Sequence, residues 1–187
     1  MNELGYRGDK HSDSMYSPPL STLQAPPVRY RTLDLTIQVL AAQALPLHNE
    51  GTNPDGFHPY VKVDLHVEQP GGGGGTGEAA TGSERSSSDG KEKDGMYKAK
   101  TKTRQGCAPD FQGEELKFER IPAVVPELSF VRFLVRDNIE FARDPLAAWA
   151  CVRLDRLKQG YRFVHLLDAH GLETEAVVLV KVSMTWT

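Results

Sequence analysis

Apolar and polar residues alternate with a period of two along several short segments of the chain. In LDLTIQVL (33–40) and YVKVDLHV (60–67), every second residue is leucine, isoleucine or valine, and most residues between them are polar. This alternation predicts half-buried β-strands, each with one face towards a core. Further strands are predicted at 97–103, 115–120, 129–135, 147–154, 160–167 and 175–184. No stretch shows a sustained helical period, so we expect an all-β fold, an eight-stranded antiparallel β-sandwich. Trp149, in one of the apolar segments, is expected in its core.

Two segments interrupt this pattern. Residues 1–30 are polar and contain the proline pairs of SPPL and APPV, which indicates an extended tail or linker. Residues 68–96 consist largely of glycine, serine, glutamate and lysine. Such a segment buries too little apolar surface to offset the entropy of ordering it, so we predict a disordered insertion between the second and third strands. The folded domain is then 31–187, with this insertion inside it.

Composition sets limits on the class of protein. The chain has 187 residues, 39% of them hydrophobic, which suffices for one domain with a core. A net charge of −3 gives no overall attraction to nucleic acid. The two cysteines form no CxxC pair, and the first residues are polar rather than a signal peptide, so we expect a cytoplasmic protein with reduced thiols. The apolar runs are shorter than the roughly 18 residues of a membrane helix.

Several segments together resemble one known family. They are VPELSFVRFLVRD (125–137), LKQGYRFVHLLDAHG (157–171), VLVKVSM (178–184), QALPL (43–47) and PYVKVDL (59–65). The chain from residue 33 onwards, apart from the insertion, resembles the C2 domain at the C-terminal end of phosphoinositide-specific phospholipase C. The short LGYRGDK (4–10) also resembles the chain just downstream of that family's catalytic barrel.

This resemblance implies a sandwich that docks on anionic membranes, often with calcium. The parent enzyme of the family hydrolyses phosphatidylinositol bisphosphate to diacylglycerol and inositol trisphosphate in lipid signalling. Its catalytic unit is a barrel of about 250 residues, and the sandwich accounts for the whole folded part of this chain. We therefore expect no phospholipase activity from this chain alone. Either the sequence is a truncated product of an active phospholipase C, or it is a module separated from its enzyme.

The segment VRDNIEFARD (135–144) carries the carboxylates that could hold a calcium ion. Asp137 and Asp144 match the outer two ligand positions of calcium-binding C2 domains. Ile139 stands where the family has another aspartate, and Glu140 is the nearest substitute. Calcium takes six to eight oxygen ligands from several loops, so this segment alone is not sufficient.

The other two loops also depart from the family. His58-Pro59 replaces the family's Asp-Pro, with Asp55 as a nearby substitute, and Ala108-Pro109 replaces its Asn-Pro. The sequence leaves three alternatives open: a solvated acidic loop, a weak calcium site completed by lipid phosphate, or a full site. We predict weak calcium binding or none.

A row of basic residues occupies alternate positions of YKAKTKTR (97–104): Lys98, Lys100, Lys102 and Arg104. On a strand, alternate side chains project from one face, and Lys62 would lie beside them if the two strands pair. Each cation near an anionic leaflet contributes about 1 kcal/mol, so this row predicts reversible binding to anionic phospholipid. The alternative is that the lysines only keep an exposed strand soluble.

Phe57 and Phe141 lie near the predicted loop tips, where an aromatic ring either inserts at a membrane interface or caps the end of the sandwich. Taken together, the sequence predicts a non-catalytic, membrane-targeting module, peripheral at an anionic membrane and attached to the catalytic barrel of a parent enzyme. The alternative is an intramolecular or protein–protein packing domain that does not touch lipid.

Overall fold

The structure, a computed structural model, describes residues 30–48, 53–68, 95–139 and 143–187. The predicted tail (1–30) and insertion (68–96) fall almost entirely outside these ranges. Eight strands form one antiparallel sheet in the order β3-β2-β5-β6-β7-β8-β1-β4. The strands are β1 (Arg31–Gln43), β2 (Pro59–His66), β3 (Met96–Lys100), β4 (Asp110–Val124), β5 (Phe130–Asp137), β6 (Leu146–Arg153), β7 (Gly160–Asp168) and β8 (Glu173–Trp186). Three single turns of 3₁₀-helix connect them: η1 (Pro54–Gly56), η2 (Pro126–Leu128) and η3 (Leu154–Arg156).

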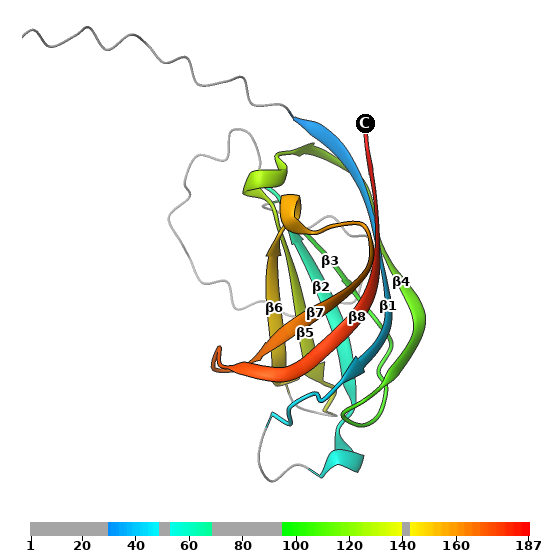
Figure 1. The fold of residues 1–187 in the computed structure, drawn as a ribbon, viewed down its shortest axis with the longest axis vertical. Helices are drawn as coiled ribbons and strands as arrows, with labels where there is room; N and C mark the ends of the chain where they lie inside the picture. The colour runs from blue at the N-terminus through cyan, green and yellow to red at the C-terminus, as the bar shows by residue number, and fades with distance from the viewer. Residues whose placement is uncertain (1–29, 49–52, 69–94, 140–142) are drawn as a thin grey trace, which may run out of the picture.

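The sheet folds back on itself to give two layers (Figure 1). Strands β3, β2, β5 and β6 form one layer, and β7, β8, β1 and β4 form the other. Only two residue pairs join β6 to β7, Ala148 to Asp168 and Trp149 to Leu167. Because β6 and β7 pair over so short a length, the sheet can bend there from one layer to the other. The two layers of strands confirm the all-β sandwich predicted from the sequence.

The core lies between the layers and is built from the alternating apolar positions. Leu33, Leu35, Ile37 and Val39 of β1 are at most 1% exposed, and they join one apolar cluster with residues of the other strands. Each fully buried side chain of this size contributes about 1.5–3 kcal/mol. The period-two pattern therefore identified both the strands and the faces that they bury.

All eight predicted strands are present, and their bounds differ from the predicted ones by at most three residues, except in β4. β3 ends at Lys100 rather than 103, because the Thr101 hydroxyl accepts the Val61 N–H in place of a backbone carbonyl. β4 runs from Asp110 to Val124, well beyond the predicted 115–120.

Trp149 is not part of the core, contrary to the prediction. It is half-buried and pairs with Leu134 of β5, whose neighbours Phe133 and Val135 face the core. Trp149 therefore lies on the outer face of its layer, with Gly171 close to its ring.

Candidate functional site

Three loops converge at one end of the sandwich, near η1 in Figure 1. Leu45 N donates to Cys107 O, Gly106 N to Phe57 O, and Asn138 N to His58 O. These bonds tie the β1–β2, β3–β4 and β5–β6 connections together. The sequence placed its candidate calcium ligands on these connections, and the structure brings the backbones of the described ones, Asp55, Asp137 and Asp144, to the same end.

Asp137 is the buried carboxylate of this loop end, with 1% exposure. Its Oδ1 accepts the His58 N–H at 2.8 Å. Its Oδ2 lies 3.1 Å from His48 Nδ1, although this close pair lacks hydrogen-bond alignment. One oxygen of the carboxylate therefore accepts a protein N–H, and the other lies close to an imidazole.

Asp144 is engaged in a similar way. Its Oδ2 accepts the Tyr60 hydroxyl at 2.8 Å, its Oδ1 lies 3.3 Å from Ile139 N, and its backbone carbonyl accepts from Arg136 at 2.7 Å. Tyr60 is a β2 residue, so this bond connects the loop end to the adjacent sheet face. Asp144 is thereby directed towards β2 and β5.

The remaining candidate ligands do not complete a cation cage in the described part of the chain. Asp55 is exposed on η1, where its carbonyl accepts the Gln105 amide. Glu140 lies outside the described residues. Among the residues that are described, no group of three His, Cys, Asp or Glu side chains could hold a metal ion. Calcium needs six to eight oxygens, and a cation between Asp137 and His48 would have to displace the imidazole. The described donors therefore do not fit a protein-ligated calcium site.

Of the two roles that the sequence left open for Phe57, its position favours capping over membrane insertion. The side chain is fully buried in the core cluster. It closes the end of the sandwich, which is the capping role left open by the sequence. Phe141 lies outside the described residues. The exposed apolar side chain that is described at this loop end is Ile139, at 36%, which the sequence analysis treated only as a missing ligand.

The basic residues of β2 and β3 lie on one sheet face. The two strands pair antiparallel with Lys62 opposite Lys100 and Asp64 opposite Lys98, so the predicted neighbourhood of Lys62 is confirmed. β5 flanks β2 on its other side and places Arg132 opposite Asp64. Positive charge from three strands therefore gathers on the outer face of this layer.

Asp64 organises this face, and the sequence analysis overlooked it. It is 1% exposed, accepts from Arg132 at 2.8 Å and lies 3.7 Å from Lys62 Nζ. A buried carboxylate is stable only when paired and hydrogen-bonded, so Asp64 fixes the positions of both cations. It also cancels part of their charge. The sequence signal for this role was that Asp64 is an acidic residue among the outward-facing residues Lys62 and His66 of β2.

Lys100 and His66 complete the face. The Lys100 ammonium lies 5.1 Å from the centroid of the Tyr60 ring, a cation–π distance. The pKa of His66 is held below its usual value by burial and, to a smaller extent, by the Arg132 guanidinium. The shift favours the neutral form of His66 on this face.

The predicted regular row does not continue past Lys100. Arg104 turns towards β4, where its guanidinium lies 3.4 Å from Phe111 O and 3.9 Å from Glu114. Lys102 remains exposed, and its backbone N–H donates to the Glu114 carboxylate. We define the basic face as Lys62, Lys98, Lys100 and Arg132, with Lys102 at its margin.

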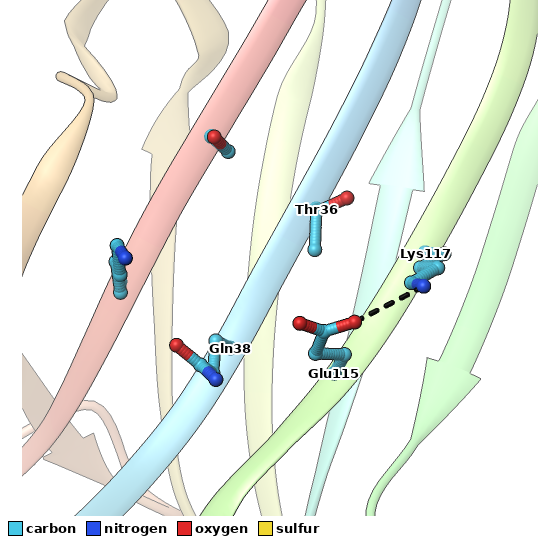
Figure 2. Close-up of a pocket in the computed structure, with 6 residues that line it drawn as sticks. Thr36, Gln38, Glu115 and Lys117 are labelled. Carbon is cyan, nitrogen blue, oxygen red and sulfur yellow. Dashed lines mark ion pairs between the residues drawn. The ribbon is translucent and has the colours of Figure 1, made fainter.

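The other layer has a shallow polar hollow of about 290 Å³ on its outer surface (Figure 2). It is lined by Thr36, Gln38, Glu115, Lys117, Lys181 and Ser183. The Lys117 ammonium lies 3.0 Å from the Glu115 carboxylate, so much of its charge is neutralised locally. These lining side chains include no histidine or cysteine and no pair of carboxylates, and their chemistry does not resemble a catalytic site.

In the part of the chain that the structure describes, no helix has the length and apolar character required to span a bilayer.

Comparison with known proteins agrees with this geometry. A model of the C2 domain matches residues 33–169. The rat 1-phosphatidylinositol 4,5-bisphosphate phosphodiesterase delta-1 is 29% identical over 156 residues, which are 83% of this chain and 17% of the rat protein. The chain thus spans about a sixth of that relative.

Two solved structures show the same fold. The crystal structure of PLC21 from S. officinalis has a TM-score of 0.54 and 17% identity, over 83% of this chain and 16% of the other. A C2 domain of plant extended synaptotagmin 1 has a TM-score of 0.52 and 15% identity, over 87% of this chain and 97% of that domain.

Proposed function

Because this chain belongs to the C2 domain family, we propose that it is a non-catalytic, membrane-targeting module that binds anionic phospholipid through the basic face. The observation that supports this most is the pairing of β2 with β3, which sets Lys62 directly opposite Lys100. Two like charges on adjacent strands repel each other, and a phosphate group between them would relieve that repulsion. The opposed lysines therefore form a seat for an acidic headgroup.

We propose that this binding depends weakly on calcium or not at all. One oxygen of Asp137 accepts the His58 N–H, and the other lies 3.1 Å from the imidazole of His48. A cation at this place would have to compete with contacts that the protein already makes. Lipid phosphate completing a weak site with Asp137 and Asp144 is the alternative that the experiment below tests.

In a longer protein similar to the rat phosphodiesterase, the module would hold a catalytic barrel at the cytoplasmic surface of a membrane. That barrel would perform the hydrolysis of phosphatidylinositol bisphosphate. The present chain, as the module alone, should give no turnover above a blank. A packing domain without lipid contact is the competing function, and in that case the lysines would serve solubility only.

Co-sedimentation with vesicles tests the proposal. The purified chain is mixed with phosphatidylserine vesicles, with or without phosphatidylinositol bisphosphate, in calcium or chelator and at low or physiological salt. Phosphatidylcholine vesicles serve as the neutral reference. We expect binding that persists in chelator and weakens with salt, because electrostatic attraction at an exposed surface is screened.

A matched pair of variants locates the site. Replacing both Lys62 and Lys100 by alanine should weaken binding about 30-fold, since each cation contributes about 1 kcal/mol. Lys117→Ala removes a lysine from the other layer and should leave binding unchanged. Binding only with calcium would instead assign the site to the loop end. No binding in any condition would favour the packing domain.

A further inference from the structure

The outer face of β7 and β8 carries an exposed apolar surface on the layer opposite the basic face (Figure 1, orange and red strands). Tyr161 and Phe163 of β7 are 60% and 66% exposed, and both lie within the strand rather than in a loop. The β7–β8 face consists of Tyr161, Phe163, His165, Val177, Leu179 and Lys181, which are three directly opposed pairs.

Exposed rings in the middle of a strand are unusual on a solvated sheet. On the neighbouring strand β1, the outward positions are polar, as at Thr36 and Gln38, which line the hollow in Figure 2. On β7 and β8 the same face presents Phe163 directly opposite Leu179. Contiguous apolar surface of this kind marks an interaction site.

A membrane is a poor partner for this surface. Glu173 and Glu175 are exposed on β8 and would be repelled by an anionic leaflet. The aromatic rings also lie within β7, where Tyr161 is opposite Lys181, so they could not enter a bilayer without immersing charged neighbours. A protein surface is the better match.

The charges of the β7–β8 face are arranged so that the face complements itself. Along β8 the outward residues run from Glu175, through apolar Val177 and Leu179, to Lys181. A copy turned end for end presents these charges in the reverse order. Lys181 of each molecule then lies over Glu175 of the other, with apolar side chains between the two ion pairs.

We propose that the β7–β8 face binds a second copy of this chain in a two-fold symmetric dimer. The contact is isologous, so each ion pair and each aromatic contact occurs twice. The face spans two strands only, which places the interface at the small end of the known range, below about 1,200 Å² in total. The dimer is therefore weak, and it forms reversibly as protein concentration rises. The basic face lies on the other layer of the sandwich and stays accessible, so the proposal does not depend on lipid binding.

Sedimentation equilibrium of the purified chain over a wide concentration range tests the dimer. The average mass should rise from the 20.7 kDa of one chain towards twice that value. Phe163→Glu should abolish the rise, because it buries a charge at the centre of the apolar contact. Circular dichroism and thermal unfolding confirm that the variant is folded. Lys117→Gln makes the same charge change of −1 on β4 and should associate as the unaltered chain does.

A charge exchange tests the register of the dimer. Lys181→Glu and Glu175→Lys each place like charges opposite each other, and each should weaken self-association by about ten-fold. An equimolar mixture of the two variants restores both ion pairs and should recover the association of the unaltered chain. A mass that stays at one chain throughout the range would overturn the proposal. So would association that survives Phe163→Glu, or a mixture that does not recover.

Discussion

The imidazole Nδ1 of His48 lies 3.1 Å from Oδ2 of Asp137, at the end of the sandwich where the family can hold calcium. The other carboxylate oxygen accepts the His58 N–H at 2.8 Å. Asp137 thereby connects the end of β5 to both ends of the β1–β2 loop. Asp137, a candidate metal ligand in the sequence, therefore holds the ends of two loops together in this structure.

The first prediction follows from this contact. Asp137→Ala should lower the free energy of unfolding by about 1.5–3 kcal/mol, because it removes the charged acceptor of the part-buried His58 N–H. Urea denaturation of the two proteins measures the difference. Asp55→Ala removes an exposed carboxylate of the same loop end and should change stability by less than about 0.5 kcal/mol. Equal losses in both variants would show that Asp137 has no special structural role.

Asp64 leads to a second prediction, in which stability and binding change in opposite directions. Asp64→Asn removes the charge that pairs with Arg132 and Lys62. The carboxylate is buried but its partners are partly exposed, so we expect a loss of about 1–2 kcal/mol, below the 3–5 kcal/mol of a fully buried pair.

The same substitution frees positive charge on the basic face, and affinity for phosphatidylserine vesicles should rise several-fold. Urea denaturation and vesicle co-sedimentation on one protein preparation measure the two effects. Glu115→Gln, which removes the carboxylate paired with Lys117 on the other layer, is the control and should leave vesicle binding unchanged. Weaker vesicle binding by a folded Asp64→Asn protein would contradict the proposed lipid site.

A third prediction concerns pH. Burial, assisted by Arg132, lowers the pKa of His66 in the folded protein, so the unfolded chain takes up a proton that the folded one resists. His66 therefore contributes its full stability above the unfolded pKa of 6.5 and loses it as the pH falls through that value towards the folded pKa. Nearby Asp64 acts in the opposite direction, and Lys98 reinforces the shift.

His66→Gln should reduce the loss of stability between about pH 7.5 and pH 5, measured as the difference in urea midpoint at the two values. An unaltered pH dependence in His66→Gln would show that the folded protein does not perturb this histidine.

The strands could be read from the sequence because alternation is a local property. Every strand with a clear period of two, such as β1, appears with the predicted face buried. The site depends instead on contacts between residues far apart in the chain. Asp64 looked like an ordinary outward residue until pairing placed Arg132 opposite it, 68 positions away. The end of β3 likewise depends on the Thr101 hydroxyl meeting Val61, which no local pattern reveals.

The fourth prediction separates a core role from a membrane role at the loop end. Phe57 is fully buried, so Phe57→Ala should cost about 3–5 kcal/mol of unfolding free energy through the cavity that it leaves. Ile139 is 36% exposed, and Ile139→Ser should leave stability within about 0.5 kcal/mol. If this loop end contacts the bilayer, Ile139→Ser should weaken vesicle binding although the protein remains folded, and Phe57→Ala should not. Urea denaturation and co-sedimentation distinguish the two, with Phe57→Leu as the conservative control. A Phe57→Ala protein that kept its stability and lost only vesicle binding would show that Phe57 contacts the membrane instead.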